Sequence, residues 1–207
     1  YDYNGKTLSS SMSIGCAVYP QDAENFSNLL QCADTALSDL KIRGRGGIQY
    51  FNENMFNVTR SKAIQIETAR RIIREKLISP YYQPKVDLKT LKVIGFEALL
   101  RWKSPETQNI YTPETIAEAF DDFELSSKIS AEMQNRIFAD IKKWQSLGKK
   151  IIPIAINASP VEFLRDNYAE TLLQRMQTAD ISPNHIEIEI TEHFFSDRGV
   201  EYVIRAL

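Results

Sequence analysis

The residues with the clearest chemical potential lie in three short apolar segments that each carry an acid or an amide. Segment 95–102 reads GFEALLRW and holds Glu97 and Arg101, 151–157 ends on Asn157, and 185–192 reads HIEIEITE. Carboxylate and amide oxygens are hard ligands suited to Mg²⁺ or Mn²⁺, and a guanidinium can hold a phosphate through paired hydrogen bonds. A metal next to a phosphate points to phosphoryl chemistry.

Glu97 and Arg101 share one face of their predicted strand, because side chains alternate between the two faces of a β-strand. At roughly 3.3 Å per residue their Cα atoms lie about 13 Å apart, which is too far for an ordinary direct ion pair. Each charge is therefore expected to have a partner of its own.

The same residues also have a purely structural explanation. Glu187, Glu189 and Glu192 could form the wet face of an edge strand, which shows the same alternation of polar and apolar residues. Asn157 precedes Ala-Ser-Pro, a context in which Asn often serves a turn or the entry to a helix. The residues alone leave a metal site and a solvated strand open.

The elements that must position these residues alternate between strand and helix. Strands are predicted from near residue 81 and at 92–102, 151–157 and 185–192. Helices are predicted at about 60–77, along the apolar face from Ile129 to Trp144, from the capping box at Ser159 and Glu162 to about 179, and from 197 onward. This alternation is typical of βα units around a parallel sheet, where functional side chains gather at the carboxyl ends of the strands.

The residues before 60 form a separate pattern. A half-buried strand is predicted at 12–18, a helix at 27–43 that Gly44 ends, and a short strand at 48–51. The Asn-rich stretch 52–57 lacks periodicity and is interpreted as part of a linker. The expected organisation is one unit at 1–51, a linker at 52–59 and a second unit at 60–207.

The composition excludes several functional classes. The chain has 207 residues, 43% of them hydrophobic, and a formal net charge of −2, so it can bury a core but has no basic field to attract a nucleic acid polymer. No apolar run approaches the roughly 18 residues of a membrane span, so no membrane contact is expected from this segment. Cys16 and Cys32 have no metal-type spacing and suit a reducing compartment, which predicts a cytoplasmic location.

Three motifs, in this order and spacing, closely resemble the EAL family of cyclic di-GMP phosphodiesterases: YYQPKVDLKTLKVIGFEALLRW, IAINAS and IEIEITE. The resemblance covers 60–207 and the first part of such a domain. It implies a modified (β/α)₈ barrel whose first strand is antiparallel, here incomplete. It also implies an enzyme in which metals activate a water that opens cyclic di-GMP to linear pGpG.

The resemblance assigns roles to individual positions. It matches Glu97, Asn157 and Glu189 to metal ligands for Mg²⁺ or Mn²⁺, Gln83 and Arg101 to positions that contact the dinucleotide, and Glu192 to a glutamate that supports a loop near the metals. The catalytic residues expected on this basis are Glu97 and Glu192, and the expected partner is cyclic di-GMP.

The first unit resembles the C-terminal part of a GGDEF, or diguanylate cyclase, domain through SMSIGCAVYP and ADTALSDLKIRGRGGIQYF. Ser38 stands where that family usually has Tyr, and Gly46 where it usually has Asn. Together the two resemblances imply an α/β chain, in which the C-terminal part of an α+β GGDEF domain precedes a partial EAL-type barrel. A homodimer through the EAL or GGDEF domain is a further expectation.

The chain also departs from the family pattern. It reaches Leu207 before the family's paired aspartates, its catalytic lysine and a later metal-binding glutamate. We therefore expect a piece of a longer protein that is inactive by itself. Segment 112–125 differs as well, with Phe120 where the family has Glu. The alternative interpretation is a catalytically degenerate EAL domain that binds cyclic di-GMP as a sensor.

Overall fold

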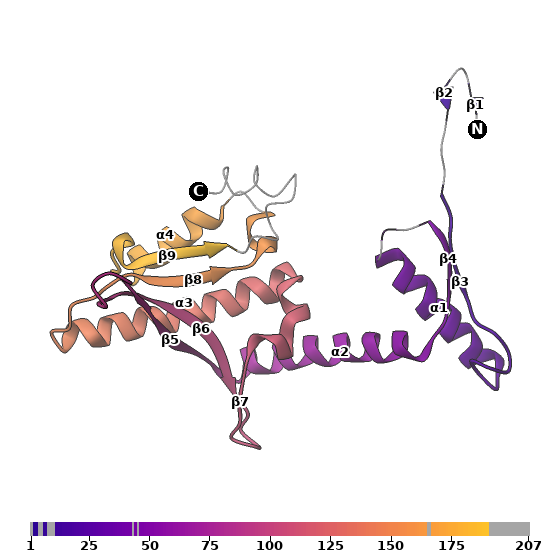
Figure 1. Ribbon diagram of the computed structural model, residues 1–207, viewed down its shortest axis with the longest axis horizontal. Helices are drawn as coiled ribbons and strands as arrows, with labels where there is room; N and C mark the ends of the chain where they lie inside the picture. The colour runs from indigo at the N-terminus through magenta and orange to yellow at the C-terminus, as the bar shows by residue number, and fades with distance from the viewer. Residues whose placement is uncertain are drawn as a thin grey trace. The chain divides into compact units, whose positions relative to one another are not determined.

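The computed structural model describes residues 2–3, 6–7, 11–42, 44, 46–164 and 167–190 of the chain. The chain divides into two compact units, Tyr1–Ile64 and Gln65–Leu207 (Figure 1). Each unit has its own β-structure, so each is described by itself. Within the described ranges, no helix has the length and apolar character needed to cross a membrane.

The first unit is built on a β–α–β element. β3 (Ser13–Cys16) pairs in parallel with β4 (Gly47–Tyr50), and α1 (Phe26–Ile42) connects them. At the start of the chain, β1 (Asp2–Tyr3) pairs antiparallel with β2 (Lys6–Thr7). The predicted order of strand, helix and strand in this unit is confirmed.

The helix α2 (Glu53–Arg74) begins earlier than predicted. The stretch 52–59, predicted to be a linker, is helical from Glu53 onward. Asn52 explains the difference, because its Oδ1 accepts the N–H of Met55 at 3.2 Å and so caps the helix, while Met55 itself is buried. The boundary between the two compact units falls inside this helix, between Ile64 and Gln65.

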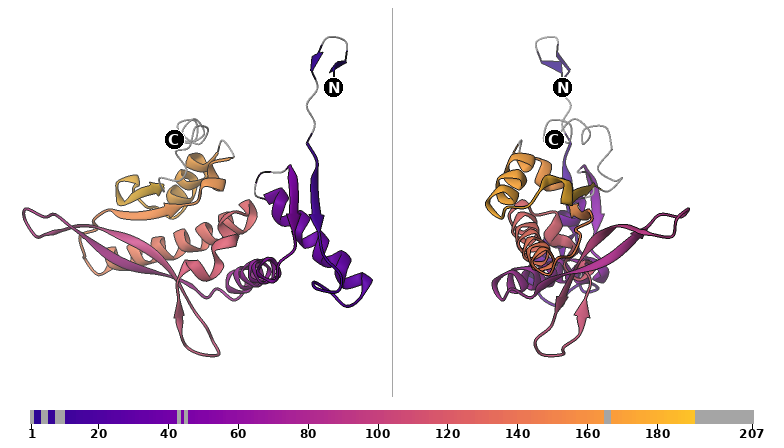
Figure 2. Two further views of the ribbon diagram at one scale, coloured as in Figure 1. Left: turned by 45° about the vertical axis from the view of Figure 1, so that its right-hand side comes forward. Right: turned by 90° about the vertical axis from the view of Figure 1, so that its left-hand side faces the viewer.

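The second unit contains a five-stranded sheet in the order β5–β6–β8–β9, with β7 (Ile110–Tyr111) paired to β6. β5 (Ile78–Val86) runs antiparallel to β6 (Val93–Lys103), and Figure 2 shows this hairpin as a long twisted ribbon. β8 (Ile154–Ala158) is parallel to β6, and β9 (Ile186–Ile190) is parallel to β8. An antiparallel first strand followed by parallel strands agrees with the fold that the resemblance implies.

Helical segments connect the parallel strands. α3 (Phe123–Ser146) is capped by Asp122, whose side chain accepts the N–H of Leu125 at 2.9 Å. Gly148, at φ +67°, lies just beyond the end of the helix as predicted. The remaining connections are η1 (Pro113–Phe120) before α3, and η2 (Pro160–Leu164), α4 (Tyr168–Thr178) and η3 (Pro183–His185) between β8 and β9.

The helix predicted from the capping box at Ser159 to residue 179 is divided in the structure. Its first part is the 3₁₀ turn η2, and α4 begins only at Tyr168. The Glu162 carboxylate accepts the N–H of Ser159 at 3.0 Å, as a capping box requires, but the same oxygen also accepts the Ser130 hydroxyl of α3 at 2.8 Å. This contact fixes the first turn against α3, a tertiary constraint that the local pattern does not contain.

The sheet of the second unit has one apolar face and one polar face. Even-numbered strand residues such as Ala98, Ile154 and Ile156 join a core with Ile129 and Ile137 of α3, which lies along β6 and β8 (Figure 1). Because the strands are in register, the odd-numbered residues point to the opposite side. We call these residues the polar face: Gln83, Lys85, Glu97, Arg101, Asn157, Glu187 and Glu189.

Candidate functional site

Glu97 and Asn157 are brought together by the parallel pairing of β6 and β8. Glu97 lies opposite Ala155, so Asn157 is one step further along the same face. The Asn157 Nδ2 atom donates a hydrogen bond to Glu97 Oε1 at 2.9 Å. This bond uses one of the two carboxylate oxygens of Glu97 and the nitrogen of the Asn157 amide, so the amide oxygen and the other carboxylate oxygen remain available to a cation.

Glu189 reaches the same face from the neighbouring strand. It is the direct cross-strand partner of Asn157 in the β8–β9 pair. Lys85 lies between the acids of β9, with its Nζ 2.6 Å from Glu189 Oε1 and 3.2 Å from Glu187 Oε2. The hydrogen bond to Glu189 is the largest of the effects that raise the pKa of the Lys85 ammonium, so this lysine is charged at neutral pH.

Arg101 and Gln83 complete the set that the resemblance assigns on the described residues. Arg101 donates from Nη1 to the carbonyl oxygen of Leu100 at 2.7 Å rather than to Glu97, as the spacing of the two charges predicts. A hydrogen bond with the Thr112 side chain is the largest effect that lowers the pKa of Glu114, and the charge of Arg101 makes a smaller contribution. Gln83 is exposed and lies opposite Glu97 in the β5–β6 pair.

The predicted site residues therefore lie on one surface, except Glu192, which is not among the residues that the structure describes. Gln83, Glu97, Arg101, Asn157 and Glu189 all lie on the polar face, which is the arrangement that a common site requires. Glu192 falls outside the residues that the structure describes, so its predicted supporting role stays a prediction. Both interpretations of the β9 acids thus retain support, because Glu187 is exposed while Glu189 is half-buried next to Asn157.

The donor set can be tested for its fit to a divalent cation. In the described part of the chain, no group of three or more His, Cys, Asp or Glu side chains is arranged to hold a metal. The candidate set has two carboxylates and one amide oxygen, and all three are hard oxygen donors from adjacent strands. The ammonium of Lys85, 2.6 Å from Glu189 Oε1, occupies one of these oxygens and would compete with a metal for it. These donors fit Mg²⁺ or Mn²⁺.

Sequence reasoning missed Lys85, although its position contains a signal. It stands two residues after Gln83 in the strand, so the alternation that places Gln83 on the polar face places Lys85 there as well. Its partners lie more than one hundred residues away along the chain, as the separations of 102 and 104 residues to Glu187 and Glu189 show. Only the order of the strands reveals that pairing.

Comparison with known proteins supplies the family. A model of the EAL domain matches residues 66–207. A signaling protein of uncharacterized function from Caulobacter vibrioides is 29% identical over 190 residues, which cover 92% of this chain and 23% of that protein. The biofilm architecture maintenance protein MbaA of Vibrio cholerae is 30% identical over 186 residues, covering 89% of this chain and 23% of MbaA.

The name of a third relative states two enzymatic activities. The bifunctional diguanylate cyclase/cyclic di-GMP phosphodiesterase MucR of Pseudomonas aeruginosa is 27% identical over 193 residues, covering 93% of this chain and 28% of MucR. The chain thus spans about a quarter of the length of these curated relatives.

Solved structures agree on the fold. The PaMucR phosphodiesterase in complex with c-di-GMP superposes with a TM-score of 0.60 at 22% identity, covering 68% of this chain and 57% of that one. The EAL domain of FimX from Xanthomonas citri, also in complex with c-di-GMP, superposes with a TM-score of 0.56 at 16% identity, covering 72% of this chain and 55% of that one. With the polar face, the strand order and the matched family model in agreement, this chain belongs to the EAL domain family through residues 66–207.

Proposed function

We propose that the second unit is part of a phosphodiesterase that hydrolyses cyclic di-GMP to linear pGpG with Mg²⁺ or Mn²⁺. The observation that carries the proposal is the convergence of Glu97, Asn157 and Glu189 from three adjacent strands on one face of the sheet. Gln83 and Arg101 lie on that same face and offer hydrogen-bond donors to a phosphodiester.

The side chains have distinct tasks in this proposal. Glu97, Asn157 and Glu189 would hold the cation, and the bond from Asn157 to Glu97 fixes the direction of the carboxylate before substrate arrives. Arg101 binds a phosphate of the dinucleotide, for which it must exchange its present bond to the Leu100 carbonyl. When bound, the divalent cation supplies a Lewis acid that lowers the pKa of water and neutralises phosphate oxygens.

The experiment is an assay of the full-length protein with Mn²⁺ and cyclic di-GMP, with pGpG measured by chromatography. We expect the wild-type protein to form pGpG and Glu97→Ala to form none, because the variant lacks one of the proposed ligands. An exposed lysine on the β5–β6 turn provides a matched control, so Lys89→Ala should leave turnover unchanged. A wild-type protein without pGpG, or a Glu97→Ala variant with full turnover, would refute the proposal.

A second candidate function is a sensor that binds cyclic di-GMP without hydrolysing it. The observation in its favour is the ion pair between Lys85 and Glu189, which places a positive charge beside a proposed metal ligand. Calorimetry separates the two functions, since a sensor binds the dinucleotide in the presence of Mn²⁺ and leaves it intact. Absence of binding would exclude both.

We also infer that the first unit is the C-terminal part of a GGDEF domain. The parallel β3–α1–β4 element supports this, as does the 93% of the chain that aligns with MucR, a named diguanylate cyclase and phosphodiesterase. The S helix-GGDEF-EAL structure of Vibrio cholerae LapD covers 88% of this chain with a TM-score of 0.58 at 16% identity. A crystal structure of the full-length protein would refute the assignment if the strands preceding Ser13 did not continue a GGDEF fold.

A further inference from the structure

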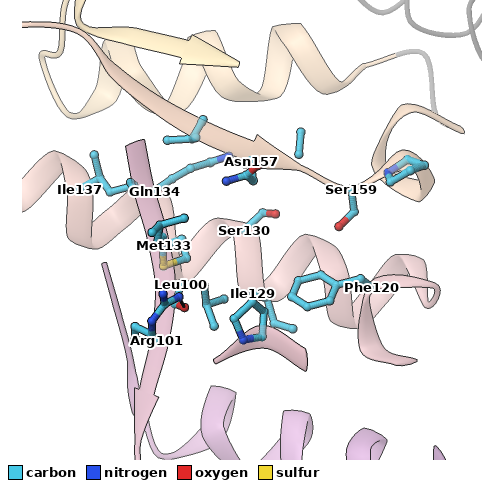
Figure 3. Close-up of a pocket in the computed structure, with 16 residues that line it drawn as sticks. Leu100, Arg101, Phe120, Ile129, Ser130, Met133, Gln134, Ile137, Asn157 and Ser159 are labelled. Atoms are coloured by element: carbon cyan, nitrogen blue, oxygen red, sulfur yellow. Dashed lines mark hydrogen bonds between the residues drawn. The ribbon is translucent and has the colours of Figure 1, made fainter. Parts of the chain in front are cut away.

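A cavity opens between the sheet and α3. Its volume is about 310 Å³, and its walls come from β6, β8, η1 and α3 (Figure 3). Leu100, Phe120, Ile129, Met133 and Ile156 contribute apolar surface to these walls. Arg101 and Asn157 belong to the polar face and also line the cavity.

The cavity exists because β6 has an unpaired stretch along one edge. β5 pairs with β6 as far as Trp102, so β7 and β8 must share the other edge. The β8 pairing ends at Ala98 and the β7 pairing begins at Trp102. Among the described strands, none pairs with Leu99, Leu100 and Arg101 on this edge, and the space beside them extends inward to α3.

Gln134 is the unusual residue of this cavity. It lies on α3, is only 6% exposed, and extends from the helix toward the strand end that carries Asn157 (Figure 3). Its side-chain amide makes no hydrogen bond with any residue that the structure describes, whereas the neighbouring Ser130 hydroxyl is bound to Glu162 at 2.8 Å. The amide atoms of Gln134 are not enclosed by protein and face the space of the cavity, so they can pair with a molecule bound there.

We propose that this cavity binds a compact, neutral aromatic molecule that carries an amide, and that Gln134 is its hydrogen-bonding partner. A Gln side chain offers a donor and an acceptor side by side, which is the complement of another amide. The volume is at the lower end of the range for small-molecule sites, and the apolar walls favour an uncharged ring system. The inference stands on the cavity alone and does not depend on dinucleotide chemistry.

The chemical class of the ligand follows from how poorly the cavity suits anions and hydrocarbons. An anion would lose its hydration in a space whose lining includes one cationic side chain, Arg101, and the guanidinium of that residue already donates to the Leu100 carbonyl. A hydrocarbon would fill the apolar space but would leave the Gln134 amide unpaired. A neutral amide satisfies both requirements.

The experiment measures binding of three probes to the full-length protein by ligand-observed NMR and calorimetry: benzamide, benzoate and toluene. We expect saturable binding of benzamide and weaker binding of the other two. In Gln134→Leu, benzamide affinity should fall about tenfold, which is the loss of roughly one hydrogen bond, while toluene affinity should not fall. Met133→Trp, which fills the cavity, should abolish binding of benzamide.

A stability measurement keeps the test decisive. If Gln134 has no partner in the free protein, Gln134→Leu should unfold at a temperature equal to or above that of the wild type. The proposal is overturned by benzamide that does not bind, by benzoate or toluene that binds as tightly as benzamide, or by unchanged benzamide affinity in Gln134→Leu. A clear fall in the unfolding temperature of Gln134→Leu would also overturn it, because it would reveal an internal partner of the amide. Turnover of cyclic di-GMP enters none of these readouts.

Discussion

At the scale of single residues, the candidate site is a balance between acids and one lysine. Glu97 is held by Asn157, and Glu189 is held by Lys85 at 2.6 Å. The two arrangements leave different charges for a cation. The Asn157 amide leaves the negative charge of Glu97 intact, whereas the Lys85 ammonium neutralises that of Glu189. We therefore expect Lys85 to limit how strongly the polar face attracts a divalent ion.

Lys85→Met should strengthen Mn²⁺ binding, because it removes a positive charge that competes for Glu189. Both side chains are about a third exposed, at 33% and 38%, so solvent screening keeps the expected gain small, at about threefold to fivefold in affinity. Calorimetric titration with Mn²⁺ measures it, and Lys89→Met on the neighbouring turn is the control. An unchanged or weakened affinity would show that Lys85 does not compete with the ion.

At this scale, the sequence predicted which face of a strand a side chain occupies, because side chains alternate along a strand. It did not predict contacts between segments that are far apart along the chain. The two-residue period of a strand placed Glu97 and Arg101 on one face and kept them apart, as the structure shows. It could not reveal the Lys85 pairs or the unpartnered Gln134, because those depend on which strand or helix lies opposite in the folded chain.

At the scale of elements, close backbone approaches and buried polar contacts hold helices to strands. In the first unit, a Cβ added to Gly15 would lie 2.5 Å from the backbone nitrogen of Leu37 and 2.8 Å from its Cβ. In the second unit, the buried Glu162 joins η2 to α3 through Ser130 and Ser126. The helices that take part in these contacts were predicted from the sequence. The contacts themselves were not.

Gly15→Ala should destabilise the first unit by about 1 to 3 kcal/mol, because the added methyl group can be accommodated only if α1 moves away from β3. Chemical denaturation followed by circular dichroism measures the change. Ser38→Ala, at an exposed position of α1, serves as the control and should leave the midpoint unchanged. Equal midpoints for the wild type and Gly15→Ala would contradict the close packing.

Glu162 predicts a pH dependence of stability with a definite sign. Burial raises the pKa of this carboxyl above its ordinary value of 4.5, although its hydrogen bonds with Ser159 and the two serines of α3 act in the opposite direction. The folded state therefore keeps the proton to a higher pH than the unfolded state does. Its contribution to stability is present below pH 4.5 and is lost as the pH rises through the folded-state pKa.

Glu162→Gln tests this dependence, because glutamine does not titrate. The unfolding free energy of the wild type, relative to that of the variant, should fall as the pH rises from 4.5 toward neutrality. Glu162→Ala should cost about 1 to 3 kcal/mol at any of these pH values, since it leaves the buried partners without an acceptor. A difference between wild type and Glu162→Gln that increases with pH would contradict the assigned burial effect.

At the scale of the whole second unit, the proposed site depends on a sheet with one apolar face and one polar face. One face packs on helices, and the other presents polar side chains. Ile156 and Asn157 are adjacent in β8 yet belong to opposite faces, since Ile156 is 5% exposed and Asn157 is exposed. The sequence predicted an apolar strand at 151–157, and the structure has β8 at Ile154–Ala158 with Asn157 near its end. The functional role of the Asn157 amide stays a prediction.

This neighbouring pair provides a matched test of the two faces. Ile156→Ala should lower the unfolding free energy by about 2 to 4 kcal/mol, because it leaves a cavity in the core. Asn157→Ala should change it by no more than about 1 kcal/mol, because it removes one exposed hydrogen bond. Comparable losses for both variants in the same denaturation experiment would refute the assignment of the faces.

At this scale, the sequence did not predict the segments that connect the strands correctly. The strand order and the antiparallel β5 agree with the resemblance to the EAL family, because the motifs of that family lie on these strands. The helical state of 52–59 and the division of the helix after Ser159 were not predicted. Both depend on single polar contacts, from Asn52 to Met55 and from Glu162 to α3, which periodicity does not register.

The central claim is that Glu97, Asn157 and Glu189 share one divalent cation. Anomalous X-ray scattering from a crystal of the full-length protein grown with Mn²⁺ tests it most directly. The account predicts an anomalous peak within coordination distance of one oxygen from each of the three side chains. A crystal without such a peak, or with manganese bound only elsewhere, would contradict it.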